Sequence, residues 1–555
     1  MPKIRIVFLA ITFAFLAVEA KLAYIQVLNA QTPTENRYLQ YRKLQPERGR
    51  IFDRRGRPLV TNQTKYQVFV EPPLVKNMNE VIDAIDDVTG IGEATIEARI
   101  NPKLQWAAVA AGLDESQKKQ LEKKKIAGIG FDPQPARFYP EASLSSHLVG
   151  FVGKDQDGDN LGYGGIEGFY EQDLTGLPGL VKADNDVSGR MMLSGNRERI
   201  SSHNGRDLYL TIDNVVQHIV KEKLQAGMVR FEAASGCAIV ANPQTMEILS
   251  MVCLPDFDPE FYFKSSDDVF ANQAISTVYE PGSTFKPLIV AAGIEDGKIK
   301  PDTKMNEDGP VKVGEYSIRT WNNDYAGDIT MTQVLEKSSN VGMVYIGQKL
   351  GNDRVYDYIH RYGFGELTGI DLQGEAPAYL KPKDSWYTID YATATFGQGL
   401  AVTPLQLVRA FSSVINGGKL LRPYVVSRAV SSTRTQVFQP RVETQVLHEE
   451  TSRQVVDMLV STVENGEYRY AIPEGFHGKI GGKTGTAQIA VSGKYDASKT
   501  IASFIGFAPA TNPQFVALVI YKEPKSSIYG SETAAPVFFD IARELLVYYQ
   551  ITPDQ

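Results

Sequence analysis

The stretch from Ser283 to Lys286 has the residue types and the spacing that acyl-transfer chemistry requires. Pro281-Gly282 interrupts the preceding chain, and an apolar helix is predicted from Ser283 to Glu295. Ser283 and Lys286 are three residues apart, so their side chains share one face of that helix. A lysine held neutral can take the proton of a serine, and N–H groups at a helix start can hold an oxyanion. The stretch therefore predicts a nucleophile, its base and part of the charge stabilisation.

The S-x-x-K spacing alone does not identify a nucleophile, because a second copy occurs at Ser116 and Lys119. That copy lies in a lysine-rich stretch whose charge pattern is typical of a solvated helix face. Two later motifs favour the first copy, and they are Lys337-Ser338-Ser339-Asn340 and Lys483-Thr484-Gly485-Thr486. In this order the three motifs resemble the set found in class A β-lactamases and penicillin-binding proteins.

The second and third motifs supply functions that the first one lacks. Ser338 and Asn340 carry hydroxyl and amide groups that can relay protons and hold a substrate amide. Lys483 beside Lys286 would place two ammonium groups close together, which lowers the pKa of one and favours its neutral form. We therefore expect Lys483 to keep Lys286 in the state that a general base needs.

The third motif also predicts a place for the substrate. Gly485 would leave its strand open to a docking peptide backbone, and Thr484 and Thr486 can bind a terminal carboxylate. Alternation along a strand puts Lys483 on the face opposite to both threonines. The sequence leaves open how one site can use all of these side chains.

A regular C-terminal segment must position these residues. Strands are predicted near both of its ends and helices between them, which indicates one α+β domain whose sheet joins the two ends. The predicted strands are 208–212, 483–491, 500–507 and 514–521, together with a hairpin at 237–253. The predicted helices are 213–229 with Asp213 as N-cap, 283–295, one that starts near Thr332, and 535–549.

The preceding part of the chain is less regular. Residues 31–45 are polar and rich in turn formers, which is typical of a linker. From Arg48 to about Asn204, short β-like runs alternate with turns, and the pattern predicts a strand at 66–70 and helices at 79–87 and 114–125. No pairing of a nucleophile with a base is found in this part of the sequence.

The N-terminal 27 residues predict export of the rest of the chain. Lys3 and Arg5 precede an uncharged, mostly apolar run from Ile6 to Val18, which is shorter than the ~20 residues of an ideal membrane span. Both a cleaved signal peptide and an uncleaved anchor continuing to Val27 fit this pattern. The basic residues favour a cytoplasmic start in either case.

The two cysteines, Cys237 and Cys253, flank the predicted hairpin, and a turn near Thr245 would place them opposite each other. The preferred interpretation is two small buried side chains, since free cysteine is commonly buried. A disulfide is the alternative, and a thiol assay on the unreduced, unfolded protein distinguishes the two.

Composition and the remaining motifs narrow the range of functions that the sequence supports. The formal net charge of −7 and the pI of about 5.6 give no reason to expect nucleic-acid binding. The six histidines form no metal-ligand cluster, and stretches near residues 155, 363 and 478 miss the calcium, dinucleotide and phosphate patterns. We therefore expect no metal and no cofactor.

Over nearly its whole length, the chain resembles class B penicillin-binding proteins, the bacterial peptidoglycan transpeptidases. The likeness to their non-catalytic pedestal rests on residues 48–56, 137–140, 164–167 and 174–176. The likeness to their transpeptidase domain rests on residues 279–286, 396–399, 403–406, 416–418 and 502–509. The K-T-G-T-A-Q run resembles division-type enzymes, also called penicillin-binding protein 3, more than the elongation type. At position 273 the resemblance predicts arginine, whereas this chain has Gln273.

The resemblance implies a domain order: a cytoplasmic stub and uncleaved anchor (1–27), a linker (28–47), a pedestal of the dimerisation type (48–205) and a β-lactamase-like transpeptidase domain (206–550), in which helices flank an antiparallel sheet. The protein would then lie in the bacterial plasma (inner) membrane as a single-pass protein with its catalytic domain outside the cytoplasm. Implied partners are a polytopic glycan polymerase and division proteins.

The resemblance also implies a reaction. Ser283 would be acylated by a D-Ala-D-Ala stem peptide, and the amine of a neighbouring strand would attack the acyl-enzyme, without any cofactor. The backbone N–H groups of Ser283 and Thr486 would form the oxyanion hole. Lipid-linked precursor would be a further ligand, and β-lactams would acylate the same serine. The alternatives are an elongation-type transpeptidase, a D,D-carboxypeptidase or β-lactamase of the same fold, and a β-lactam sensor or scaffold without turnover.

Overall fold

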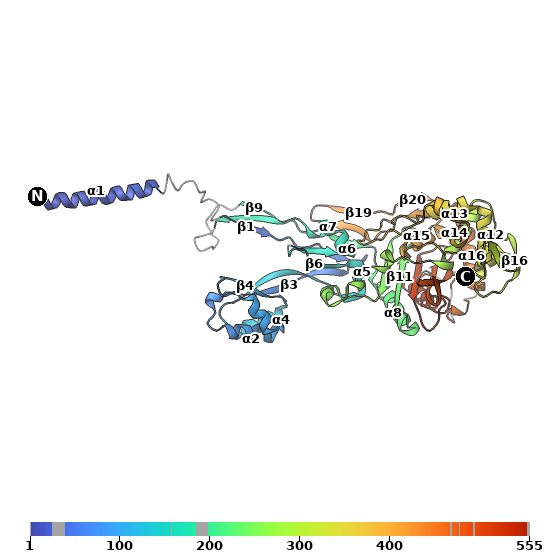
Figure 1. The fold of residues 1–555 in the computed structure, drawn as a ribbon, viewed down its shortest axis with the longest axis horizontal. Helices are drawn as coiled ribbons and strands as arrows, with labels where there is room; N and C mark the ends of the chain where they lie inside the picture. The colour runs from blue at the N-terminus through green and yellow to red at the C-terminus, as the bar shows by residue number, and fades with distance from the viewer. Residues whose placement is uncertain are drawn as a thin grey trace. The chain divides into compact units, whose positions relative to one another are not determined.

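The computed structural model describes residues 2–24, 39–156, 158–184, 198–466, 469–474, 476, 478–491 and 494–551 (Figure 1). The end of the predicted anchor and the first part of the predicted linker lie outside these residues. The chain divides into two compact units. The first consists of Met1–Arg48 and Thr175–Gly205, and the second of Gly49–Leu174 and Arg206–Gln555.

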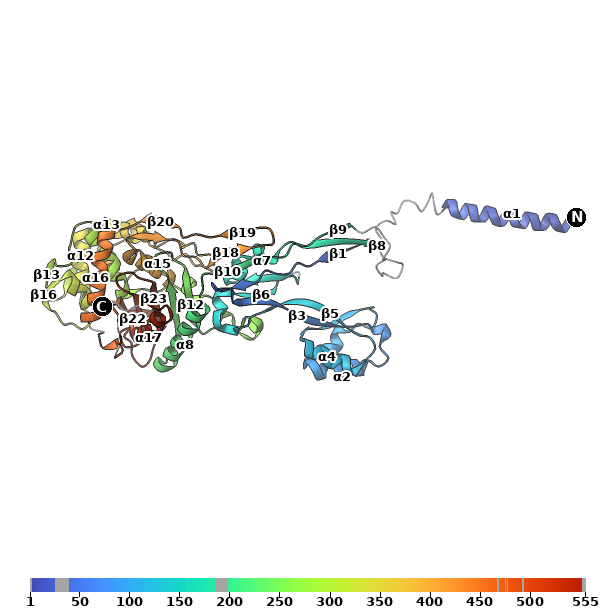
Figure 2. The same cartoon turned by 180° about the vertical axis from the view of Figure 1, so that it is seen from behind.

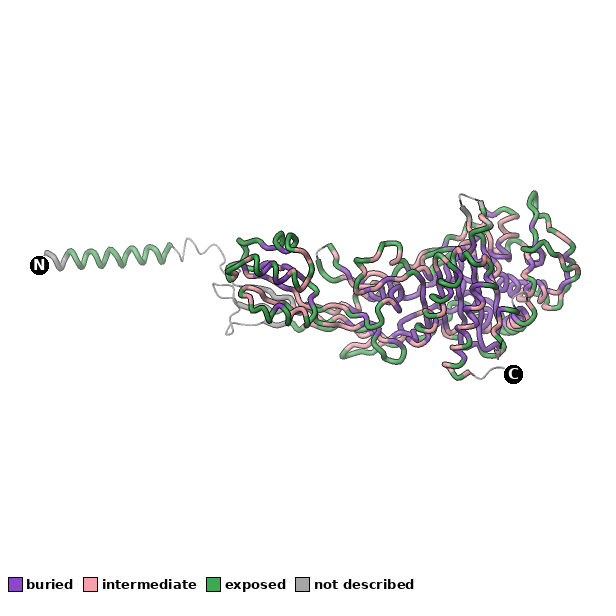
Figure 3. The backbone as a smooth tube through the Cα atoms, turned by 90° about the horizontal axis from the view of Figure 1, so that it is seen from below, coloured by how far each residue is buried: buried purple, intermediate pink, exposed green. Residues whose placement is uncertain are grey.

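The first unit contains helix α1 (Pro2–Ala23) and a three-stranded sheet in the order β1-β8-β9. Within α1, Ile6–Ala23 is long and apolar enough to cross a membrane, and the residues of this helix from Ile6 onward are exposed (Figure 3). A signal sequence meets the same criterion, so the helix fits both alternatives from the sequence. The strands are β1 (Leu39–Leu44), β8 (Gly179–Asp184) and β9 (Glu198–Ile200).

Strand β1 corrects the expectation that residues 28–47 form only a linker. It pairs antiparallel with β8, from Leu39 opposite Asp184 to Leu44 opposite Gly179. The hydrogen bonds of this strand come from a segment about 140 residues away, so the local sequence, which is polar, gives no sign of them. For the same reason residues 175–205 group with the N-terminus and not with the rest of the expected pedestal.

The second unit begins with a small α/β lobe that has its own core. Its strands are β3 (Pro58–Val70), β4 (Ala107–Leu113) and β5 (Ile129–Phe138), and its helices are α2 (Met78–Thr89), α3 (Glu93–Arg99) and α4 (Glu115–Lys124). The second S-x-x-K copy lies on α4, where Ser116 and Lys119 are exposed. The Ser116 hydroxyl donates to Asp114 Oδ1 at 2.7 Å. This copy is a solvated helix face, as predicted.

One sheet crosses the boundary expected at residue 205. Its strand order is β19-β18-β10-β2-β3-β4, with β5 on β3, and β2 (Ile51–Phe52) runs parallel to β10 (Asp207–Leu210). Strands β18 (Val426–Val430) and β19 (Thr435–Val437) complete it. Nearby, Arg137 and Glu167 form an ion pair at 2.7 Å with side chains only 5% and 0% exposed. Two of the stretches that resemble the family's pedestal domain, 137–140 and 164–167, are therefore joined by a buried ion pair.

The C-terminal part is built on a five-stranded antiparallel sheet in the order β12-β11-β23-β22-β21. Figure 2 labels β12, β22 and β23 of this sheet. The strands are β11 (Ser235–Ala241), β12 (Ile248–Leu254), β21 (Gly481–Val491), β22 (Lys494–Ala508) and β23 (Phe515–Lys522). Strand β11 pairs with β23, so the sheet joins early and late segments of this part as predicted, but the predicted strand at 208–212 belongs to the other sheet, as β10. Strand β21, which carries the K-T-G motif, is an edge strand.

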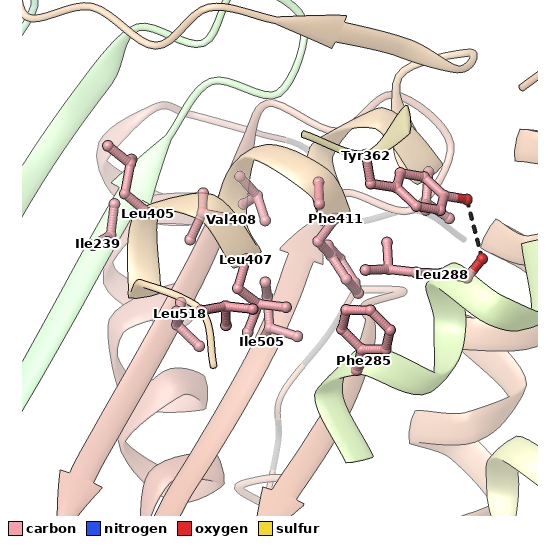
Figure 4. Close-up of a cluster of buried hydrophobic side chains, with 14 of the residues drawn as sticks. Ile239, Phe285, Leu288, Tyr362, Leu405, Leu407, Val408, Phe411, Ile505 and Leu518 are labelled. Atoms are coloured by element: carbon pink, nitrogen blue, oxygen red, sulfur yellow. Dashed lines mark hydrogen bonds between the residues drawn. The ribbon is translucent and has the colours of Figure 1, made fainter. Parts of the chain in front are cut away.

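Helices cover both faces of this sheet, and alternate residues of its strands belong to two different cores. Ala238 and Val240 pack in the cluster that contains α8 (Asn214–Phe231) and α17 (Ala534–Tyr548). Ile239 packs on the other face, with residues of α10 (Lys286–Glu295) and α15 (Pro404–Ile415) (Figure 4). Burial on both faces explains why these strands read as nearly continuous apolar runs.

The remaining helices and hairpins of this part surround the two cores. The other helices are α9 (Gln273–Ser276), α11 (Met331–Glu336), α12 (Asn340–Leu350), α13 (Asn352–Arg361), α14 (Thr388–Ala394) and α16 (Glu449–Asn465). Small hairpins pair β13 (Lys304–Glu307) with β16 (Gly327–Thr330), β14 (Val311–Val313) with β15 (Tyr316–Ile318), and β17 (Lys419–Leu421) with β20 (Val442–Gln445).

Cys237 and Cys253 form a disulfide. They are opposite each other in the β11–β12 ladder and both are buried, as the hairpin predicted. The preferred interpretation as two free thiols is wrong, because the antiparallel register brings the two Cα atoms to 4.1 Å. The sequence fits both states, since burial and pairing are common to them.

Candidate active site

Ser283 lies in a 3₁₀ turn, η7 (Gly282–Phe285), that leads directly into α10. The predicted single helix is therefore a tight turn followed by an α-helix. Gly282 has φ +56°, which favours glycine, and its N–H donates to the Gly397 carbonyl at 3.0 Å. Helix α10 is buried over its first eight residues, Lys286–Gly293. A helix that is apolar all round is stable only inside a core, so this one holds the turn rigidly.

Lys286 is completely buried, and three acceptors surround its Nζ atom. It donates to the Ser338 carbonyl at 2.5 Å, to Asn340 Oδ1 at 2.8 Å and to Ser338 Oγ at 3.2 Å. Ser338 Oγ in turn lies 3.0 Å from Ser283 Oγ. The first two motifs therefore meet in one hydrogen-bonded chain from lysine to serine to serine, and Ser283 itself is only partly buried.

The S-x-N motif is a turn just before α12. Ser338 has φ +53°, an uncommon conformation for a residue with a side chain. Asn340 begins α12, and its Nδ2 donates to the Arg319 carbonyl at 3.1 Å, which orients its Oδ1 toward Lys286. The unusual backbone of Ser338 thus presents both its carbonyl and its hydroxyl to the lysine.

The K-T-G strand lies against the turn that carries Ser283. A Cβ atom added to Gly485 would be 2.5 Å from Ser503 Oγ, 2.9 Å from Thr284 Cγ2 and 3.1 Å from the Pro281 carbonyl oxygen. One added to Gly282 would be 3.4 Å from the Thr486 carbonyl oxygen. The structure gives Gly485 a packing role: its missing side chain lets β21 approach the turn closely. The role expected from the sequence, an opening for substrate, stays a prediction.

The length of the lysine side chain lets Lys483 contact Thr484, although strand alternation puts these two residues on opposite faces. Lys483 is completely buried, yet its Nζ lies 3.3 Å from Thr484 Oγ1 and 3.4 Å from the Thr484 carbonyl oxygen. Strand β21 is at the sheet edge, so a long side chain can bend around it. The Thr486 hydroxyl accepts from the Gly530 N–H at 3.1 Å. Each threonine oxygen accepts a bond, which leaves its own proton for an incoming carboxylate.

Two carboxylates next to the motifs had no role in the sequence interpretation. Glu280 accepts from the Gly399 N–H at 3.0 Å and from the Tyr495 hydroxyl at 3.0 and 3.2 Å. Burial raises the pKa of Glu280, and burial together with the neighbouring Glu280 carboxylate raises the pKa of Tyr495 to about 12. Glu307 is buried and binds the hydroxyl of Ser339. The position of Glu280, three residues before Ser283, is a sequence signal that could have placed it in the site. Nothing in the sequence connects Glu307 to the S-x-N motif.

The described residues contain no group of three or more His, Cys, Asp or Glu side chains that could hold a metal ion. What they place together is a partly exposed serine hydroxyl, a buried lysine and hydrogen-bonded hydroxyls beside an edge strand. This arrangement can activate the serine for attack on a carbonyl group and can bind a peptide that ends in a carboxylate.

Comparison with known proteins agrees with this geometry. The family model described as the penicillin binding protein transpeptidase domain matches residues 236–543, and that of the penicillin-binding protein dimerisation domain matches residues 43–210. Stage V sporulation protein D of Bacillus subtilis is 34% identical over 97% of this chain and 84% of its own length. Peptidoglycan D,D-transpeptidase FtsI of Escherichia coli is 30% identical over 96% of this chain and 90% of its own.

Solved structures show the same architecture. A peptidoglycan synthetase from Bifidobacterium adolescentis has a TM-score of 0.75 at 26% identity, over 93% of this chain and 98% of its own. Penicillin binding protein 2X from Streptococcus thermophilus has a TM-score of 0.75 at 23% identity, over 92% of this chain and 80% of its own. The second likeness concerns the fold alone.

Proposed function

Because the chain belongs to the class B penicillin-binding protein family, we propose that it is a peptidoglycan D,D-transpeptidase whose nucleophile is Ser283. The observation that carries the assignment is the chain of contacts from Lys286 through Ser338 to Ser283, with distances of 3.2 and 3.0 Å. Ser116, in the other S-x-x-K copy, is exposed on α4 and hydrogen bonds to a carboxylate instead.

The acceptors around Lys286 can hold a neutral amine as well as an ammonium group. A neutral amine has two N–H donors and one lone pair, and two non-hydroxyl acceptors, the Ser338 carbonyl and Asn340 Oδ1, lie within 2.8 Å. When Lys286 is neutral, its lone pair replaces the N–H that points to Ser338 Oγ at 3.2 Å, and it can then take a proton from the hydrogen-bonded pair of Ser338 and Ser283. Lys286 is then the general base, directly or through Ser338, and Asn340 keeps it oriented.

In the acylation step, Ser283 Oγ forms a bond to the carbonyl carbon of the penultimate D-Ala and the bond to the terminal D-Ala nitrogen breaks. The proton of Ser283 passes to Lys286 and then to the leaving amine, so the charges balance. The N–H groups of Ser283 and Thr486 stabilise the oxyanion. The hydroxyls of Thr484 and Thr486 bind the terminal carboxylate beside Lys483, and Gly485 keeps the strand close to Ser283.

In the second step, the amine of a stem peptide from a neighbouring glycan strand attacks the acyl-enzyme and restores Ser283. We propose that this cross-linking serves septal wall synthesis during cell division, since K-T-G-T-A-Q resembles the division-type enzymes. A fluorescent fusion that labels the side wall and not the septum would contradict the septal role.

We also propose that α1 is an uncleaved single-pass anchor in the plasma membrane, with the catalytic part outside the cytoplasm. Lys3 and Arg5 before the span favour a cytoplasmic N-terminus. The partners would be lipid-linked precursor, a polytopic glycan polymerase and division proteins. N-terminal sequencing of the membrane-bound protein tests the anchor, because a start near residue 21 would indicate a cleaved signal peptide.

Labelling with a fluorescent penicillin, followed by mass spectrometry, tests the nucleophile in the full-length chain. Wild type and Ser116→Ala should carry the label on the peptide that contains Ser283, whereas Ser283→Ala should carry none. Persistent label in Ser283→Ala would overturn the assignment. Rapid release of the acyl group would indicate a β-lactamase, and failure to join two stem peptides would indicate a carboxypeptidase.

A further inference from the structure

Glu307 is a buried carboxylate beside the S-x-N turn. It is the last residue of β13, where Met305 and Glu307 point inward and Lys304 and Asn306 point outward. Its side chain has 1% exposure, and among the described residues no ion pair to it is found. A buried carboxylate without a cation is costly, so its hydrogen bonds must account for its presence there.

The hydrogen bonds of Glu307 go to the S-x-N side of the site. Oε1 accepts from the hydroxyl of Ser339 in a short hydrogen bond, and Oε2 accepts from the Ala326 N–H at 3.4 Å. Ser339 Oγ also accepts from the Gly342 N–H at 2.8 Å, as the N-cap of α12. A hydroxyl has one proton, so the bond from Gly342 leaves that proton for Glu307.

Ser339 is the middle residue of the motif, and both of its neighbours hold Lys286. The Ser338 carbonyl, which accepts from Lys286, belongs to the peptide bond that joins Ser338 to Ser339. Asn340, on the other side, accepts from Lys286 through Oδ1. A rotation of Ser339 would therefore move both the Ser338 carbonyl and Asn340 Oδ1 away from the lysine.

The turn also needs support from outside because Ser338 has a left-handed backbone, φ +53°. Such a conformation persists where the surroundings fix it. Two hydrogen-bonding groups, called anchors here, hold the hydroxyl of Ser339, the residue after Ser338. They are the N–H of Gly342 from α12 and the carboxylate of Glu307 from the separate β13–β16 hairpin. Ser339 itself is 1% exposed, so solvent cannot replace either anchor.

We propose that Glu307 is a positioning residue for the acylation reaction. By fixing Ser339 it keeps Ser338 and Asn340 in the orientation that holds Lys286 and links it through Ser338 to Ser283. This inference rests on the proposed function, in which Lys286 is the base, and it adds a residue that no motif contains. Glu307 acts through Ser339 and does not touch the substrate.

The test compares Glu307→Ala, Glu307→Gln, Ser339→Ala and the double variant Glu307→Ala/Ser339→Ala in the full-length protein. The rate constant of acylation at saturating fluorescent penicillin is measured separately from the dissociation constant of the non-covalent complex, together with the melting temperature. We expect Glu307→Ala to slow acylation by about tenfold or more, since displacements of ~1 Å cost about 100-fold, and to change the dissociation constant less than about threefold.

Two results distinguish positioning from general structural support. Because both residues act on one turn, the double variant should be no slower than the slower single variant. Glu307→Gln should recover most of the rate, since its amide oxygen can still accept the Ser339 proton. Asp328→Asn is the matched control: its carboxylate is exposed on the same hairpin, accepts from Asn306 Nδ2 at 3.1 Å, and should leave the rate unchanged.

An acylation rate for Glu307→Ala within twofold of wild type would overturn the proposal, even if the melting temperature falls. So would a double variant whose loss equals the product of the two single losses. If Glu307→Ala does not fold, Ser339→Ala decides, and a full acylation rate in that variant overturns the proposal. Label that persists in Ser283→Ala would instead refute the proposed function, so the two failures are distinguishable.

Discussion

The substitution Gly485→Ala tests how closely the K-T-G strand must approach Ser283. The new Cβ atom would lie 2.9 Å from Thr284 Cγ2 and 3.1 Å from the Pro281 carbonyl oxygen. Ser503 Oγ, at 2.5 Å, is the end of a small side chain and can rotate away. Thr284 cannot, because its hydroxyl donates to the Pro281 carbonyl at 2.7 Å and fixes the methyl group. The strand and the turn must therefore separate.

The size of the separation gives the expected effect. Carbon atoms pack at about 3.5 Å, so β21 and η7 must move apart by ~0.6 Å. A displacement of ~1 Å at a reacting centre costs about 100-fold, so we expect acylation by penicillin to slow by about tenfold. Overpacking of this kind also costs about 1–3 kcal/mol of unfolding free energy. Both effects originate at one contact and should appear together.

Gly309→Ala is the control, since no atom lies within 4 Å of its added Cβ and its φ is not left-handed. The same change in the unfolded chain then cancels between the two variants. Acylation is followed by in-gel fluorescence over time, and stability by thermal unfolding of the detergent-solubilised full-length chain. Acylation of Gly485→Ala within twofold of Gly309→Ala would show that close strand approach is not required.

Three further predictions concern stability. Burial raises the pKa of Glu280, so the folded protein binds a proton at this carboxylate more tightly than the unfolded chain does. Wild type should therefore lose stability relative to Glu280→Gln as the pH rises from about 4.5 through the raised pKa. Melting temperatures of both proteins across that range check the sign, and parallel curves would contradict it. Replacing Cys237 and Cys253 by alanine opens a loop with a sequence separation of 16 and should cost about 3 kcal/mol in urea unfolding; an unchanged midpoint would contradict this. Arg137→Ala removes the cation that pairs with the buried Glu167 at 2.7 Å and should cost about 3–5 kcal/mol without slowing acylation per folded molecule.

Local patterns predicted the elements of the C-terminal part well. Asp213 is the N-cap of α8, and β23 (Phe515–Lys522) agrees with the predicted strand at 514–521. Such signals are contained in a few neighbouring residues, because caps and apolar periodicity act within one or two turns. The same locality explains two of the misses. The pairing of β1 with β8 and the bond between Cys237 and Cys253 depend on which segments meet in space.

The order of the three motifs in the sequence was sufficient to select Ser283 and Lys286 over the copy at Ser116. Only the tertiary structure decided how these residues are held. It set the left-handed backbone of Ser338, the buried contact of Glu307 with Ser339, and the packing reason for Gly485. Residue types fix which protons and charges are available, whereas distances of 3 Å between segments far apart in the chain are fixed by how the cores pack.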